Sequence, residues 1–238
     1  MSELEPPELV AAPESGRVFE WKLLPGIADA AGSGRVRLDA IARWLADAAY
    51  LDARDAGLVQ EGLWVLRRSQ IRVARFPVFG EEVALRTFCS GIGRFSAERR
   101  TTIAGATSAV EAAGLWVWLD AETLTPLRFP PEFVEVYGES AGGREAKVRL
   151  RHPDPTERAA QTKWRFRASD CDIAGHVNNA SYLAVVEEEL ASDDPESLEI
   201  EIEYRGPAQP GEAFLIADGD RRWIAGAIGE IYASILLR

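Results

Sequence analysis

The same order of predicted elements occurs twice in this chain, and that repetition limits the possible folds more than any other feature. Each copy starts with an alternating strand, continues through an apolar helix and ends in closely spaced strands. The first copy has strands at 18–23, 64–75, 81–89, 94–104 and 109–119 with a helix at 38–57; the second has strands at 162–167, 198–205, 212–217, 221–228 and 230–237 with a helix at 179–191. This order predicts an α+β protein made of two antiparallel units.

Short matches between the two copies support an internal duplication. A shift of 131 residues places Gly80-Glu81-Glu82-Val83 on Gly211-Glu212-Ala213-Phe214, and a shift of 141 residues places Gly34-Arg35-Val36 on Gly175-His176-Val177. Each match is short, but both agree with the repeated order of the elements.

The domain boundaries follow from composition. Residues 1–16 are rich in Glu, Pro and Ala without periodicity, which predicts a disordered tail. The first unit then covers 17–125. Residues 126–160 are rich in Pro and Gly and predict a linker with a short helix near 131–137. The second unit, 161–238, carries the candidate active site.

The turn before the second helix concentrates groups that do chemistry. Between a strand and a helix, the chain brings together Asp170, Asp172, Gly175, His176 and two asparagines. The first amides of a helix have no partner within the helix, and the helix dipole adds positive charge there, so this end can bind an anion or a polarised carbonyl oxygen. Asp172 and His176 are predicted to lie beside that position.

The string D-x-D-x-x-G-H-V-N-N-x-x-Y of this turn resembles the active-site turn of hot-dog-fold thioesterases. Further segments follow the order found in the acyl-acyl carrier protein (acyl-ACP) thioesterase family: Trp64-Val65-Leu66-Arg67-Arg68, Phe79-Gly80-Glu81-Glu82-Val83, Trp116-Val117-Trp118-Leu119 and Glu203-Tyr204-Arg205. The resemblance covers roughly 17–238. It implies a tandem (double) hot-dog fold, in which each half is a curved antiparallel sheet wrapped around a central helix.

The resemblance implies hydrolysis of fatty acyl-ACP to free fatty acid. Asp172 would be the general base or the nucleophile, and the amides around Val177, Asn178 and Asn179 would bind the substrate and hold the developing oxyanion. His176 would polarise the carbonyl, position water or assist the sulfur leaving group. The two asparagines are expected to act first as a helix cap and a turn brace.

Two polar groups of the plant-type family members are absent. Ala174 stands where those members place an Asn, and Pro207 stands where they place a Glu. One of the three glutamates Glu187, Glu188 and Glu189 could compensate from the helix. The first unit lacks the catalytic groups as well, since Ala31 and Arg35 occupy the positions of Asp172 and His176.

That asymmetry predicts that the first unit binds the acyl chain and the second unit carries the chemistry. A bulky change on the first helix, such as Ala48→Trp, is therefore expected to shorten the preferred chain.

The charge of the chain constrains its partners. A formal net charge of -11 argues against nucleic acid and anionic membranes as partners. An acidic acyl carrier protein, or a coenzyme A thioester, would need a local basic patch. Two runs are candidates, although either run is equally typical of a solvated face: Arg144, Lys147, Arg149, Arg151 and His152, and Arg94, Arg99 and Arg100.

Other residues restrict the class of protein. Two Cys and two His give neither a disulfide framework nor a metal-ligand motif, so no metal or cofactor is expected. The acidic start and the lack of a long apolar run favour a cytoplasmic protein. A homodimer remains open.

Three other functions compete with this prediction: an acyl-CoA thioesterase, a non-catalytic acyl-binding protein and a serine hydrolase. The last rests on the G-x-S-x-G match around Ser140, which lacks the entering strand and leaving helix of a nucleophile elbow and is disfavoured.

Overall fold

A computed structural model describes residues 9–58, 62–156 and 159–238. The predicted tail therefore lies half outside the described residues. Among the described helices, none combines the length and apolar character needed to cross a bilayer.

The elements follow the predicted order in both units. The first unit holds β1 (Phe19–Leu23), α1 (Leu38–Asp55), β2 (Leu63–Arg75), β3 (Val83–Ile92), β4 (Ser96–Ala104) and β5 (Ala109–Leu119). Helix α2 (Pro131–Ala141) follows and is longer than predicted. The second unit holds β6 (Ala160–Phe166), α3 (Asn179–Leu190), β7 (Leu198–Tyr204), β8 (Gly211–Asp218), β9 (Arg221–Gly226) and β10 (Ile231–Leu237).

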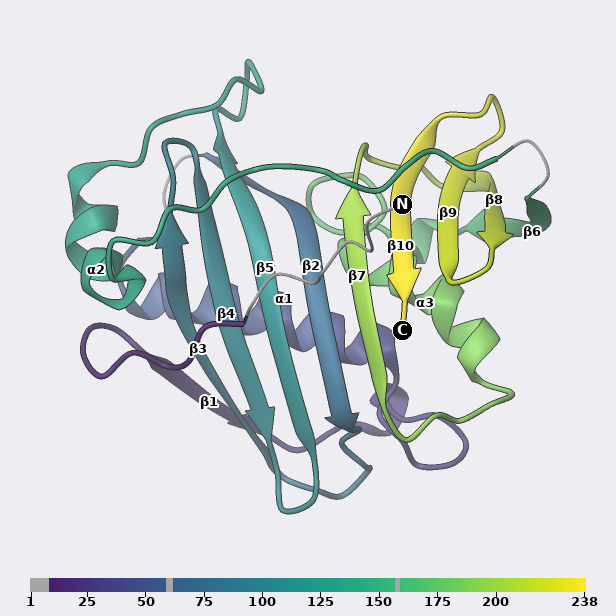
Figure 1. The fold of residues 1–238 in the computed structure, drawn as a ribbon, viewed down its shortest axis with the longest axis horizontal. Helices are drawn as coiled ribbons and strands as arrows, with labels where there is room; N and C mark the ends of the chain where they lie inside the picture. Colours follow the sequence, from purple (N-terminus) through teal and green to yellow (C-terminus); the bar gives the residue numbers. More distant parts are fainter. Residues whose placement is uncertain (1–8, 59–61, 157–158) are drawn as a thin grey trace.

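The ten strands of the described residues form one antiparallel sheet in the order β1-β3-β4-β5-β2-β7-β10-β9-β8-β6. The two halves of this order are equivalent, because β1, β3, β4, β5 and β2 correspond in sequence to β6, β8, β9, β10 and β7. The halves join where β2 pairs with β7 (Figure 1). In that pairing Gln70 lies opposite Glu201, its own counterpart under the 131-residue shift. The pairing thus places a local two-fold axis between these two residues, as a duplicated unit requires.

The main core lies between the sheet and the helices α1 and α3, which pack against each other on one face of the sheet (Figure 1). Helix α1 turns an apolar side inward, with Leu38, Ile41, Trp44 and Ala48 buried. Their spacing of three and four residues puts them on one helical face. Helix α2 covers a second cluster beside β3 and β4.

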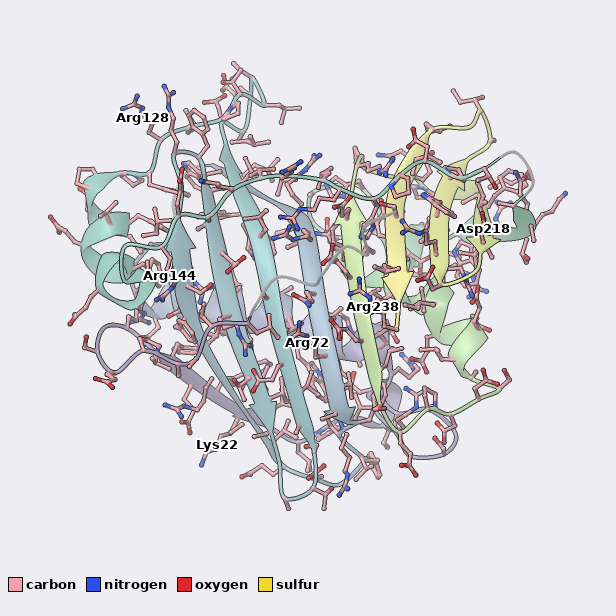
Figure 2. The ribbon with its side chains drawn as sticks, viewed as in Figure 1. Lys22, Arg72, Arg128, Arg144, Asp218 and Arg238 are labelled. Atoms are coloured by element: carbon pink, nitrogen blue, oxygen red, sulfur yellow. The ribbon has the colours of Figure 1, made fainter. Side chains whose placement is uncertain are left out.

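The opposite face of the sheet is crossed by residues 144–156, which we call the strap (Figure 1). The strap starts beside α2, where Arg144 donates from Nε to the Ser90 carbonyl at 2.7 Å (Figure 2). Further along, the buried Glu203 carboxylate accepts the backbone amides of Arg151 at 2.5 Å and His152 at 3.0 Å. These bonds fix the strap on the face away from the helices.

The structure also brings His152 together with Glu201 and Glu203, which sequence spacing did not suggest. The His152 ring bonds through Nε2 to Glu201 at 3.1 Å and through Nδ1 to Ser234 at 3.2 Å. Because both ring nitrogens already have protein partners, this cluster clamps the strap to the sheet.

Candidate active site

The second turn, residues 167–178, has a rigid backbone framework. Asp170 closes its start, since its carboxylate accepts the Arg167 amide at 2.7 Å and its carbonyl accepts the Asn178 amide at 2.8 Å. Gly175 adopts a φ of 76°, which favours glycine, and this lets the chain reverse so that the Asp172 amide donates to the His176 carbonyl at 3.1 Å. The turn therefore presents Asp172 and His176 from a fixed backbone.

The Asp172 carboxylate is half-buried and held by two donors. One oxygen accepts the Ala174 amide at 2.9 Å, and the other accepts Asn178 Nδ2 at 3.0 Å. Asn178 is itself fixed, because its Oδ1 caps α3 by accepting the Ala180 amide at 2.8 Å. The prediction of Asn178 as a cap and brace is confirmed. Each Asp172 oxygen keeps a lone pair for substrate or water.

Of the three backbone amides predicted to hold the oxyanion, two have partners within the protein. The Val177 amide donates to the Ala208 carbonyl at 2.9 Å, and the Asn178 amide is taken by Asp170, so neither is available to an oxyanion. These two donors were predicted wrongly, because Ala208 lies in a distant loop and Asp170 closes the turn itself. The Asn179 amide, the first of α3, donates to no other group in the part of the chain that the structure describes. One of the three predicted donors is thus left for a ligand.

His176 is also half-buried, and its Nδ1 lies 3.2 Å from the Val177 carbonyl. Its Nε2 contacts no hydrogen-bonding partner within the described ranges, which leaves that nitrogen for a ligand.

Two cavities meet at this site. The first has a volume of about 200 Å³ and combines residues of both units around Asp172, Ala174, His176, Asn178 and Asn179. The second has a volume of about 340 Å³ and is mainly apolar. Its lining comes from α1, α2, β2 to β5 and the loop before β2, together with Ile173 of the second turn. The cavities share Ala46, Trp64, Arg99 and Trp116 in their walls.

The first turn, residues 26–37, repeats the backbone framework but contains no open site. Its Ala31 amide donates to the Arg35 carbonyl at 2.7 Å, matching Asp172 and His176. The position beside the helix is filled, because Glu187 of α3 accepts the Leu38 amide at 2.8 Å and pairs with Arg35 at 2.5 Å. Leu38 is the 141-residue counterpart of Asn179. An amide at this position therefore does bind a carboxylate oxygen in the first unit.

The counterpart of Glu187 under the same shift is Ala46, which lines both cavities. Where the first unit has a carboxylate, the second has a methyl group and open volume. The Asn179 amide consequently faces a site that the protein leaves unfilled.

The glutamates predicted as compensating groups have other contacts. Glu187 pairs with Arg35, and Glu189 accepts Arg222 Nε at 2.8 Å. Glu188 is exposed, and none of the three lines a cavity. Pro207 lies exposed in the loop after β7, outside both linings. Asp172 is therefore the carboxylate of the first cavity among the described residues.

That loop is braced against α3 by Tyr182. The Tyr182 hydroxyl accepts the Ala208 amide at 2.9 Å, and burial raises the pKa of the phenol to about 12. Since Ala208 in turn holds the Val177 amide, the brace supports the second turn.

The structure corrects two predictions about the surface. In the run Arg94, Arg99 and Arg100, Arg99 points into the cavities and Arg100 is buried beside Glu111, so this run is not a basic patch. In the other run His152 is buried, which leaves Arg144, Lys147, Arg149 and Arg151 as exposed cations on the strap.

Ser140 and Ala48 are both buried, so neither side chain is accessible to a substrate. Ser140 is buried in α2 with its hydroxyl donating to the Tyr137 carbonyl at 3.0 Å, which excludes a nucleophile elbow. Ala48 is buried in the core and lines neither cavity, so its side chain does not border the space in which an acyl chain could lie.

Two units that each wrap a half-sheet around a helix, with an acid-bearing turn facing a cavity between them, define a tandem hot-dog thioesterase. The comparisons with known proteins identify the family. The model of the acyl-ACP thioesterase N-terminal domain matches residues 17–137, and that of the acyl-ACP thioesterase C-terminal domain matches residues 154–222. The chain belongs to the acyl-ACP thioesterase family, as the motif order predicted, and is a thioester hydrolase.

Individual relatives agree with this assignment. An uncharacterized protein of Mycobacterium tuberculosis is 26% identical over 214 residues, which cover 87% of this chain and 85% of the relative. A chloroplastic acyl-[acyl-carrier-protein] hydrolase of Cuphea viscosissima is 24% identical over 199 residues and 71% of this chain, which spans about half (47%) of that plant protein.

A solved structure confirms the fold. The crystal structure of an acyl-ACP thioesterase from Bacteroides thetaiotaomicron superposes with a TM-score of 0.78 at 15% identity, covering 93% of this chain and 98% of the other.

Proposed function

We propose that the second turn is the catalytic centre for hydrolysis of the acyl-ACP thioester, with Asp172 as the general base. The observation that carries this proposal is the unfilled Asn179 amide beside Asp172 and His176, at a position where the first unit binds a carboxylate.

The chemistry follows from these three groups. Asp172 removes a proton from water, whose oxygen forms a bond to the thioester carbon. The Asn179 amide and the dipole of α3 stabilise the negative charge that develops on the carbonyl oxygen. The carbon–sulfur bond then breaks, and the leaving thiolate takes up the proton that Asp172 removed from water. His176 Nε2 would pass this proton on, which restores the Asp172 carboxylate. The products are a fatty acid and the thiol of the carrier.

The acyl chain would extend from this centre into the second cavity. That cavity is lined mainly by the first unit and contains apolar side chains such as Ala49, Ala53 and Phe133. Burial of methylene groups there stabilises the complex by about 0.8 kcal/mol each. The first unit would thus hold the acyl chain, while the second unit would carry the chemistry.

The carrier would dock at the edge of the second unit. The exposed cations of the strap lie on the sheet face away from α3, whereas the turn lies beside α3 (Figure 1). Edge strand β6 exposes Lys163 and Arg165 and leads directly into the turn, whose first residue is the exposed Arg167. None of these three forms an ion pair among the described residues. An acidic carrier would find local attraction there on an otherwise acidic protein.

The test is release of free thiol from a panel of acyl-ACP and acyl-CoA thioesters by the purified protein. We expect release with acyl-ACP, and with acyl-CoA only to a smaller extent. Reversing Lys163 and Arg165 to Glu should weaken use of acyl-ACP and its salt dependence while sparing a small thioester. The same reversal at Lys147 and Arg149 on the strap is the matched control.

The second candidate, a non-catalytic acyl-binding protein, is favoured by Ala174 and Pro207, which replace polar groups of plant-type members. Measurable acyl binding with no thiol release from any thioester would overturn catalysis in favour of this candidate.

A further inference from the structure

Arg99 of β4 lies where the two cavities meet and contributes to the wall of both. Its side chain is 13% exposed, and its Nη1 donates to Asp52 at 2.5 Å and to Thr87 at 3.4 Å. Its Cζ lies 5.4 Å from the centre of the Tyr137 ring. Within the ranges that the structure describes, its Nε and Nη2 form no hydrogen bond to a carbonyl or carboxylate oxygen, so this part of the guanidinium can donate to a ligand in the cavities that Arg99 lines.

The carboxylate that holds Arg99 is shared. Asp52 is fully buried and also accepts Arg17 Nε at 2.6 Å and the Tyr137 hydroxyl at 2.9 Å. Burial by itself lowers the pKa of Arg99, and its attraction to Asp52 outweighs that effect, so the guanidinium keeps its charge. Because one carboxylate serves two guanidinium groups, it does not use up the donors of Arg99.

Contact with an unsubstituted alkyl chain is unfavourable for the Arg99 guanidinium. Such a chain would displace water from the free N–H groups of Arg99 and offer them no acceptor, and unsatisfied charged donors are costly when desolvated. Most of the surrounding wall is apolar, including Ala46, Trp116 and Phe133. The cavities thus combine room for hydrocarbon with one charged donor.

We propose that Arg99 is a specificity-determining residue, and that the preferred acyl group carries a neutral oxygen, as a hydroxyl or keto group, which accepts a hydrogen bond from Arg99. A carboxylate fits less well, because Glu98 also lines the second cavity and Asp52 lies beside Arg99. This inference rests on the proposed thioesterase function and adds a substrate class to it.

The experiment compares coenzyme A thioesters of equal chain length that are unsubstituted, hydroxylated at carbon 3 or at the chain end, or oxidised to a keto group at carbon 3. The readout is the ratio of kcat/KM for each oxygenated thioester to that for the unsubstituted one. In the wild-type protein at least one of these ratios should be about 10, as expected for one hydrogen bond to a charged group.

Arg99→Met should bring that ratio close to 1, because only the oxygenated thioesters lose a hydrogen bond, whatever the change in kcat/KM for the unsubstituted thioester. The matched control is Arg100→Met. Arg100 is the neighbouring buried arginine, donates to the Ala112 carbonyl at 3.0 Å and lines neither cavity, so its removal should leave the ratio unchanged.

Thiol release with all wild-type ratios near 1 would overturn the role of Arg99 while leaving the thioesterase function intact. If Arg99→Met does not fold, or if no thioester is hydrolysed, calorimetric binding of hydroxylated and plain fatty acids to the wild-type protein decides. Tighter binding of the hydroxylated acid supports the inference, and equal or weaker binding overturns it. A total absence of thiol release would contradict the proposed thioesterase function, whereas the binding measurement alone would decide the role of Arg99.

Discussion

The two turns share one backbone and differ in what fills the space in front of it. Asp29 and Asp170 are counterparts, and each carboxylate accepts a turn amide, from Gly26 at 2.9 Å and from Arg167 at 2.7 Å. The bonds that shape the turn are thus present twice. Asp172, by contrast, has Ala31 as its counterpart, and nothing in the first turn replaces its carboxylate.

This comparison separates structural residues from functional ones. A residue that recurs with the same contacts in both units serves the turn, as Asp29 and Asp170 do. A residue that occurs once, beside a cavity, is available for chemistry. Glu187 and Ala46 are counterparts that differ in the same way. The Glu187 carboxylate fills the site in front of the first turn, whereas Ala46 leaves the site in front of the second turn open.

The largest effect is expected from emptying the closed site. Glu187→Ala removes the partner of the buried Arg35 and of the Leu38 amide, which should cost about 3–5 kcal/mol of the free energy of unfolding. Urea denaturation measures this loss. The control is Glu189→Ala, whose partly exposed pair with Arg222 should contribute less than about 1 kcal/mol. Equal small losses for both variants would contradict our view of the closed site.

Closing the open site should abolish most activity. Ala46→Glu places a carboxylate at the counterpart of Glu187, where it would compete for the Asn179 amide. Loss of an oxyanion donor typically costs about 2.7–4 kcal/mol, so thiol release should fall about 100-fold or more. Ala46→Gln, with the same size and no charge, should lose less. If neither substitution changed the rate of thiol release, the Asn179 amide would not be the oxyanion donor.

The size of the second cavity should set the longest acyl chain that the protein hydrolyses efficiently. Ala49→Phe on α1 fills part of the second cavity and should lower kcat/KM for the longest acyl chains about 10-fold or more relative to short chains. Val134→Phe on α2 adds the same ring at an exposed position that lines neither cavity and should leave the chain-length profile unchanged. Identical profiles for both variants would place the chain elsewhere.

The smallest effect concerns the clamp of the strap. Burial by itself raises the pKa of the Glu201 carboxyl, but the hydrogen bond and charge of His152, with the charge of Arg68, lower it on balance. A lowered pKa means that the stabilisation is present above the carboxyl's ordinary pKa and is lost as the pH falls through the folded-state value. Glu201→Gln should therefore flatten the acid limb of the stability curve, measured by urea denaturation. An unchanged limb would show that the clamp does not contribute.

Much of the fold was predictable from the sequence because it depends on local patterns. The alternation in the strands, the helical spacing of Leu38, Ile41 and Trp44, and the motif order each predicted an element or the family. The cap by Asn178 followed from its place directly before a helix.

Contacts between distant segments were not predictable in this way. The Val177 amide meets Ala208, and Arg99 turns inward toward Asp52, because of strand register and packing across the fold. The filling of the first site by Glu187 likewise joins residues 149 positions apart. The shift that aligns the two units could have signalled the contrast between Glu187 and Ala46, but only once the counterpart helices were known to pack together.

The most direct test of the account compares Asp172→Asn with Asp170→Asn in thiol release from acyl-ACP. Asparagine at 170 can still accept the Arg167 amide, so this variant should keep nearly the wild-type rate. Asn at 172 cannot act as a base, so this variant should lose activity about 100-fold or more while urea denaturation shows that it still folds. Wild-type rates from folded Asp172→Asn protein would contradict the claim that the second turn is the catalytic centre.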